Sequence, residues 1–238
     1  MKKLLLILLC FPFLVFSQNE KRLALIIGNA NYDKGVLKNP VNDALLISET
    51  LKQLEFDVIL DTNIADKRSF TQTITEFGNR RSDYDVALVY YAGHGIEIDN
   101  QNFLLPTKEE FASEYDVQDY GVSVQDIMSY ICGDDNYYNS FRAFSTLSGS
   151  VASDGVGDNS LYCESLCKNM LVENISIATV FRNVRKEMII KTDGNQKTQD
   201  FDYLVGEEFY FSKSTSNKGN IFILDISRDN PFRKGVTR

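Results

Sequence analysis

Two segments carry polar side chains directly after an apolar run. The segment Tyr90–Gly95 contains His94, the only histidine among 238 residues, and the segment Leu224–Phe232 contains Ser227. Functional groups of parallel sheets collect just beyond the carboxyl ends of the strands. An imidazole there can act as a general base and a hydroxyl as a nucleophile. From the residues alone, His94 can also be structural, and Ser227 can instead cap a turn.

Cys132 is an alternative nucleophile, 38 residues after His94 in the chain. It follows a stripe of apolar residues at helical spacing, and its acidic neighbours at 134 and 135 disfavour a thiolate. Cys163 and Cys167 are four residues apart and share one helix face, as buried small apolar residues do. With a single histidine in the chain, we expect no metal site and no cofactor.

The elements that position these residues alternate between apolar runs and helical patterns. A parallel sheet covered by helices on both faces follows from that alternation. Strands are expected at 22–27, 56–60, 85–91, 141–147 and 220–225, and helices from 39 to 54, 66–80, 124–131, 159–171 and 176–190. A hairpin is expected at 95–105, turning at Asp99-Asn100.

The first 17 residues have the pattern of a secretory signal peptide: a basic start, a short apolar run and a small residue. The apolar run is shorter than the roughly 20 residues that a spanning helix needs. The expected location is therefore outside the cell or in the periplasm, without a stable membrane anchor. The net charge of −8 argues against a nucleic-acid partner. The sequence leaves the oligomeric state open.

Several motifs together resemble the caspase-like cysteine peptidases of family C14, in particular the bacterial relatives of metacaspases and paracaspases. These motifs are Ile27–Tyr32, Leu37–Ala44, Tyr91–Gly95, Ser148–Gly155 and Val205–Phe211, the last resembling the closing strand. The resemblance extends over residues 21–233. It implies a three-layer α/β/α sandwich with a mainly parallel central sheet, and a peptide or protein as substrate.

In that family a cysteine attacks the peptide carbonyl, a histidine is the general acid and base, and backbone N–H groups bind the oxyanion. The resemblance assigns the histidine to His94 and one oxyanion donor to Gly95. In that family, an acidic residue two positions before the cysteine helps to hold a basic substrate side chain. The residue at that position here is Asp225. Asp154, in the Gly-rich loop, is a second candidate for substrate contact. A turn role for Asp154 and a strand-end role for Asp225 remain open.

The nucleophile motif departs from the family pattern in two ways. It stands at 220–232, at the end of the chain, and Ser227 occupies the place of the cysteine. The interval between 131 and 141 is too short for a strand plus the motif. We therefore expect a permuted order in which residues 220–225 insert beside the His94 strand. A serine hydroxyl is a weaker acid than a thiol, so the chain is expected to be a weak or inactive endopeptidase, or a non-catalytic peptide-binding protein.

Overall fold

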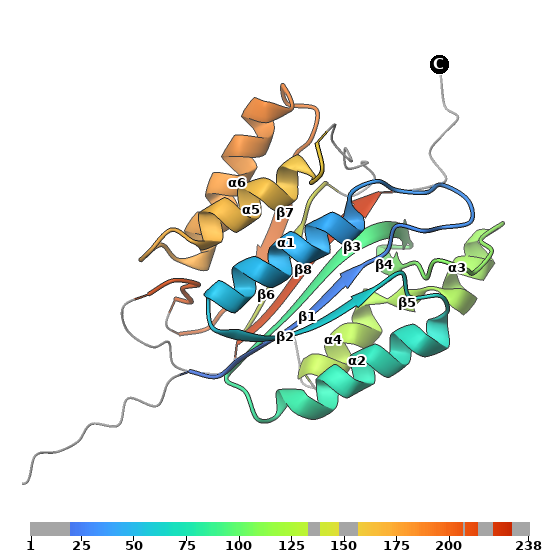
Figure 1. The fold of residues 1–238 in the computed structure, drawn as a ribbon, viewed down its shortest axis with the longest axis horizontal. Helices are drawn as coiled ribbons and strands as arrows, with labels where there is room; N and C mark the ends of the chain where they lie inside the picture. The colour runs from blue at the N-terminus through green and yellow to red at the C-terminus, as the bar shows by residue number, and fades with distance from the viewer. Residues whose placement is uncertain (1–19, 133–138, 148–156, 207, 214–220, 230–238) are drawn as a thin grey trace, which may run out of the picture.

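The computed structural model describes residues 20–132, 139–147, 157–206, 208–213 and 221–229 (Figure 1). The strands are β1 Arg22–Gly28, β2 Phe56–Thr62, β3 Val86–Ile98, β4 Gln101–Leu104, β5 Val122–Ser123, β6 Ser140–Phe144, β7 Gln199–Asp202 and β8 Ile221–Asp229. The helices are α1 Pro40–Gln53, α2 Lys67–Arg81, α3 Glu114–Tyr120, α4 Val124–Cys132, α5 Leu161–Met170 and α6 Ile177–Lys191.

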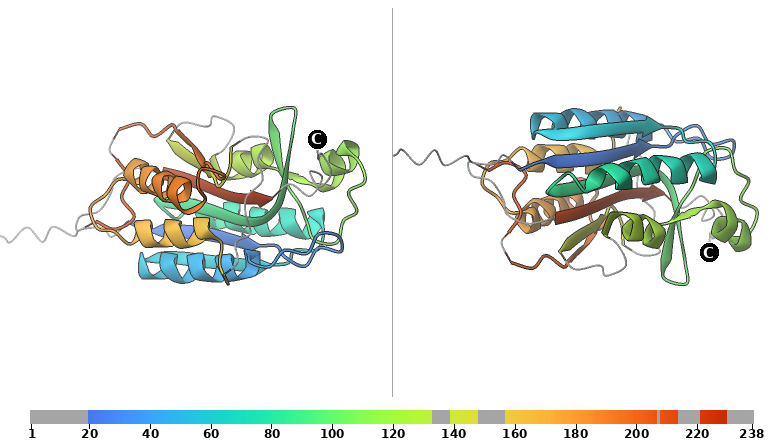
Figure 2. Two further views of the ribbon diagram at one scale, coloured as in Figure 1. Left: turned by 90° about the horizontal axis from the view of Figure 1, so that it is seen from above. Right: turned by 90° about the horizontal axis from the view of Figure 1, so that it is seen from below.

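The main sheet has the strand order β2-β1-β3-β8-β6-β7. Its first five strands run parallel, and β7 pairs antiparallel with β6 at the edge. Figures 1 and 2 show α1, α5 and α6 over one face and α2 and α4 over the other. Each face has its own apolar core, drawn from alternate residues of the strands. The expected three-layer α/β/α sandwich is confirmed.

The strand that carries His94 continues past the end of its neighbour. The last register pair of β1 and β3 is Gly28 with Ala92, whereas β3 extends to Ile98. It then turns back into β4 through Asp99 and Asn100, which both have positive φ, as two-residue hairpin turns require. The hairpin is confirmed at the expected turn. The short helix α3 and strand β5 that follow were not anticipated from the sequence.

The last strand of the chain fills the centre of the sheet. β8 pairs in parallel with β3 on one side and with β6 on the other, where the sequence placed residues 220–225. Its run Ile221–Leu224 is apolar throughout, as strands covered on both faces are. Ile223 is only 2% exposed and belongs to the core under α1, α5 and α6.

The expected closing strand at Val205–Phe211 is wrong. The antiparallel edge strand is β7, three residues earlier in the chain, and Tyr210 makes only an isolated bridge with Ser176. Phe209 and Phe211 are buried in the core, and Arg22 donates a hydrogen bond of 2.6 Å to the Phe211 carbonyl. The Arg22 guanidinium lies over the Phe209 ring, and Phe209 packs edge-on against Phe211, so these residues join the core instead of forming a sheet ladder.

The insertion of β8 makes a testable demand on Ile223. Replacing a buried isoleucine by alanine costs about 2–5 kcal/mol, so Ile223→Ala should lower the free energy of unfolding by that amount in chemical denaturation. The control is Ile190→Ala, because Ile190 lies at the end of α6 with 68% exposure and should change stability by about 0.5 kcal/mol or less. Equal small effects of the two substitutions would contradict the insertion.

Candidate active site

His94 lies near the end of β3, and its side chain is almost fully buried at 3% exposure. Its Nε2 is 2.6 Å from the carbonyl oxygen of Gly35. Because a carbonyl oxygen can only accept, Nε2 carries a proton in this contact. In the neutral ring, Nδ1 is then the basic nitrogen. The structure thus orients the imidazole with a main-chain group, which no side-chain motif in the sequence could reveal.

The loop that presents the Gly35 carbonyl is held at several points. Gly35 has a φ of +79°, and a Cβ added to it would lie 3.1 Å from His94 Nε2. Asn63 Oδ1 accepts hydrogen bonds from the backbone of Ala30 and Asn31 at 2.9 and 3.0 Å. Lys108 donates to the Asn31 carbonyl. These hydrogen bonds restrain the loop and thereby the position of the Gly35 carbonyl relative to the imidazole.

Two tyrosine hydroxyls contact the main chain of His94. Tyr32 Oη accepts from the His94 N–H at 2.9 Å, and Tyr91 Oη donates to the His94 carbonyl at 2.7 Å. The ring of Tyr32 also packs on the imidazole, with 4.3 Å between centroids. Neither tyrosine was predicted to belong to the site, although Tyr32 ends the motif Ile27–Tyr32 and Tyr91 begins the motif Tyr91–Gly95.

The backbone N–H of Gly95 points toward the β8 side of β3. On the other side, the Ala92 carbonyl accepts from Asn29 next to β1, and His94, two residues later, faces the same way. Peptide groups of successive strand residues point in opposite directions, so Gly95 faces β8. This direction is compatible with the oxyanion-binding role expected for Gly95.

The backbone register brings the C-terminal motif beside the histidine motif. Ser227 stands opposite Ala92, two positions before His94, and Asp225 stands opposite Tyr90. The two segments that the sequence analysis predicted to follow strands are therefore neighbours at the carboxyl end of the parallel strands.

Cys132 lies away from this edge. It ends α4, and its neighbour Tyr130 packs against Gly78 near the end of α2, where an added Cβ would be 3.2 Å from the Tyr130 carbonyl oxygen. α2 begins beyond the carboxyl end of β2 and runs back along the sheet (Figure 1). The backbone of Cys132 therefore lies toward the end of the sheet where the strands begin, whereas His94 is at the opposite end.

Asp154 and the motif Ser148–Gly155 lie outside the described residues, but the segment that follows them is firmly placed. Asp43 Oδ1 accepts from the backbone of Ser160 at 2.9 Å and from the Asn159 side chain at 3.0 Å. Asp43 is 2% exposed, and burial raises the pKa of its carboxyl above 3.8, against the opposing effect of these hydrogen bonds. The start of α5 is thus fastened to the first turns of α1.

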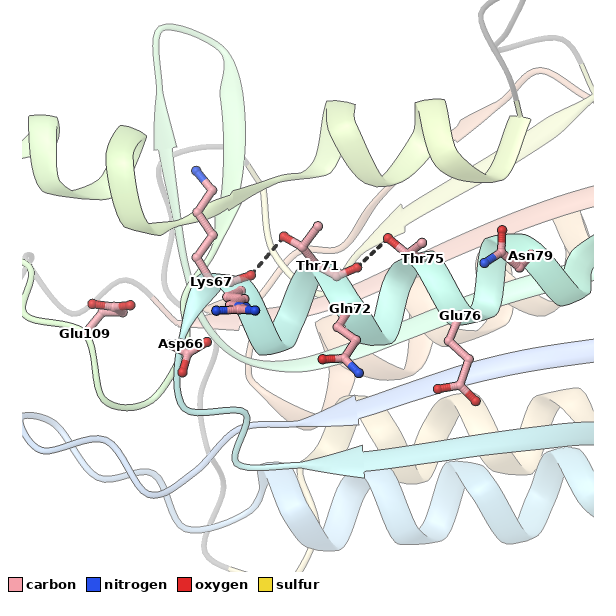
Figure 3. Close-up of a pocket in the computed structure, with 9 residues that line it drawn as sticks. Asp66, Lys67, Thr71, Gln72, Thr75, Glu76, Asn79 and Glu109 are labelled. Atoms are coloured by element: carbon pink, nitrogen blue, oxygen red, sulfur yellow. Dashed lines mark hydrogen bonds between the residues drawn. The ribbon is translucent and has the colours of Figure 1, made fainter.

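A hollow of about 920 Å³ runs along α2 and contains none of the predicted site residues (Figure 3). It is lined by polar and charged residues, and the hydroxyls of Thr71 and Thr75 donate to carbonyls within the helix. Among the described residues, no group of three or more His, Cys, Asp or Glu side chains is placed to hold a metal ion. No helix in the same part of the chain is long and apolar enough to cross a membrane.

Comparison with known proteins agrees with this fold. Residues 21–137 match the family described as the caspase domain. A 90-residue stretch is 35% identical to the human mucosa-associated lymphoid tissue lymphoma translocation protein 1, covering 37% of this chain and 11% of that relative. The crystal structure of caspase-1 from Spodoptera frugiperda superposes with a TM-score of 0.67 at 17% identity, over 84% of this chain and 94% of that one.

The sandwich and the histidine at the end of its third strand define a caspase-like α/β protein. Over residues 21–137, the chain is a member of the caspase-domain family, peptidase family C14. It spans about a tenth of the length of the curated relative that it matches.

Gly35→Ala tests the contact that orients His94. The added Cβ crowds Nε2, so the 15N resonances of the only histidine should report a changed tautomer population. Gly194→Ala is the matched control, because Gly194 has a similar φ of +76° with nothing within 4 Å of an added Cβ. Both substitutions should cost about 1–3 kcal/mol through backbone strain. Identical histidine spectra for the two variants would contradict the contact.

Asp43→Asn tests the buried carboxylate. The folded state binds the Asp43 proton more tightly than the unfolded chain, so the stability contributed by the protonated form is lost as pH rises from 3.8 through the folded pKa. Asparagine keeps an acceptor for Ser160 but does not titrate. The unfolding free energy of the wild type should therefore fall relative to that of the variant as pH rises from about 3 to 7. Parallel pH profiles of the two proteins would exclude a raised pKa.

Proposed function

We propose that this chain is an exported homologue of the caspase-like endopeptidases in which His94 and Ser227 occupy the positions of the catalytic dyad, with little or no turnover. The observation that supports this most is the register of β8, which sets Ser227 opposite Ala92 and two residues from His94. A peptide or protein with a basic residue before the scissile bond is the proposed ligand.

The proposed permutation rests on the sheet order. Along the chain, the next strand of the main sheet after β3 is β6, but these two strands are not neighbours. β8, which comes later in the chain, lies between them. Only residues 133–139 separate α4 from β6, which is too short for another strand and its motif. The match to the caspase domain ends in this same interval, at residue 137.

The expected weakness of catalysis follows from two properties of the pair. A cysteine thiol with a pKa near 8.5 is readily ionised by a histidine, whereas a serine hydroxyl needs a stronger base. A carboxylate behind the imidazole would stabilise the imidazolium as it forms. Here the group behind His94 is the neutral carbonyl of Gly35. That arrangement suits a thiolate nucleophile better than an alcohol.

The remaining roles are proposed by position. The Gly95 N–H would donate to the oxyanion, because it faces the side of β3 on which β8 lies. Asp225, two residues before Ser227, would receive a basic substrate side chain, and Asp154 would contact substrate from the loop before α5. Export rests on the leader at residues 1–17, which lies outside the described part of the chain.

The second candidate function is a pseudopeptidase that binds peptides without cleaving them. Ser227 favours this second function, because a serine is a weak nucleophile at this position. The sheet and the surroundings of His94 are retained, and they would still offer a binding site for a peptide. Turnover separates the two functions.

The test compares wild type, Ser227→Cys, Ser227→Ala and His94→Ala on peptides containing Arg or Lys. Ser227→Cys should raise kcat/KM at least ~10-fold, because it restores a nucleophile that His94 can ionise. His94→Ala introduced into that variant should abolish the gain. Cys132→Ala is the control and should leave it intact.

Robust wild-type turnover that Ser227→Ala abolishes would overturn the proposed weakness of the serine. A gain in Ser227→Cys that is independent of His94 would overturn the dyad. Loss of activity in Cys132→Ala would move the nucleophile to α4.

A further inference from the structure

On the side of β3 that faces β1, the main chain of His94 lies beyond the last residue pair of these two strands. The last pair between β1 and β3 is Gly28 with Ala92, so β1 has ended before His94 is reached. A strand peptide normally satisfies its N–H and C=O through the neighbouring strand. Beside His94, the hydroxyls of Tyr32 and Tyr91 stand in the place of that neighbour, together with the N–H of Leu105.

We propose that Tyr32 and Tyr91 are positioning residues that hold the His94 peptide at both its N–H and its C=O and so fix the imidazole against Gly35. This inference deepens the proposed function, because it concerns the same histidine, but its test requires no turnover.

The two hydroxyls form one buried unit. They are 3.0 Å apart, and both lie near the carbonyl of Leu105, at 3.1 Å for Tyr32 and 3.2 Å for Tyr91. The Asn29 amide donates to the same carbonyl at 3.1 Å. The end of β4, the loop after β1 and the His94 peptide are thus joined at one point. Displacement of either hydroxyl therefore moves the others.

Burial keeps the hydroxyls in the state that this role requires. Tyr91 has 0% exposure, and burial followed by the nearby Tyr32 raises its pKa well above 10. Tyr91 therefore remains protonated, and able to donate to the His94 carbonyl, over the pH range in which the protein is folded. Tyr32 is 5% exposed, and its hydroxyl accepts from the His94 N–H.

The residue between Ala92 and His94 is adapted to the tyrosine pair. A Cβ added to Gly93 would lie 2.5 Å from the Tyr91 hydroxyl oxygen and 2.6 Å from that of Tyr32. Any larger side chain would push both hydroxyls away from the His94 peptide. The small residue before the histidine is therefore required by the tyrosines, independently of any contact with substrate.

Tyr32 links the two ends of the arrangement. Its hydroxyl contacts the His94 backbone, while its ring lies 4.3 Å from the imidazole centroid. The side chain therefore restrains both the peptide and the ring rotation that sets the 2.6 Å contact of Nε2 with Gly35. Both tyrosine hydroxyls contact the main chain of His94, so both can act through the position of this residue.

The test uses the full chain without a histidine tag, so that every imidazole signal comes from His94. Tyr32→Phe and Tyr91→Phe remove one hydroxyl each and keep the aromatic ring. Nitrogen-15 shifts of the ring report which nitrogen carries the proton, and the exchange rate of the His94 amide reports its hydrogen bond.

We expect wild type to show the Nε2-protonated tautomer and both variants to show a mixture of tautomers. Exchange of the His94 amide should accelerate at least ~10-fold in Tyr32→Phe, whose hydroxyl accepts from it. In the Ser227→Cys background, both variants should lose ~10-fold or more in kcat with little change in KM.

Tyr90→Phe is the matched control, because Tyr90 is a fully buried neighbour in β3 that packs in the other core of the sheet from Tyr91. It should leave the tautomer and the amide exchange unchanged. Melting curves confirm that each variant is folded, and if one of the two variants does not fold, the other decides. Wild-type tautomer and exchange rate in a folded Tyr32→Phe or Tyr91→Phe would overturn the proposal, whatever the result for Ser227.

Discussion

The parallel pairing of β8 with β3 is the constraint on which the rest of the site depends. It closes the sheet between β3 and β6, buries Ile223 in the larger core and sets Ser227 opposite Ala92. β8 is paired on both sides, so the sheet is incomplete without this strand. The fold and the position of the candidate dyad therefore depend on the same strand, and a defect in β8 affects both.

The environment of His94 is made largely of main-chain groups and tyrosine hydroxyls. The Gly35 carbonyl orients the ring, and the two hydroxyls hold the peptide where β1 no longer reaches it. These three contacts come from neutral groups, so they restrain the imidazole without adding a negative charge behind it. This arrangement is compatible with a histidine that assists a thiol, which explains why a serine at the partner position weakens the proposed chemistry while leaving the architecture intact.

Much of the fold could be predicted because its strands and helices have strong periodicity. The segments that became β1, α1, α2 and α6 were recognised within a few residues. The closing strand was misplaced because it was assigned from the resemblance of Val205–Phe211 to the family motif, whereas the Phe209 ring lies beneath Arg22 and packs edge-on against Phe211. The short elements α3 and β5 lack a run long enough to show a period.

The candidate site was predictable only where side-chain motifs carried it. His94 and Ser227 were predicted from their motifs, and the register places their backbones on neighbouring strands. The contact between the Gly35 carbonyl and His94 could not be predicted, because every residue type carries a main-chain acceptor. Only the glycine itself is visible in the sequence. The role of Tyr32 and Tyr91 depends on where β1 ends relative to β3, which only the register reveals.

The most direct test of the account is the distance from Ser227 Oγ to His94 Nδ1 in an experimental structure of the folded chain. The account predicts a separation of about 3 Å, or slightly more in the absence of a ligand, with β8 paired between β3 and β6. A structure with residues 221–229 outside the sheet, or with Ser227 directed away from His94, would contradict it.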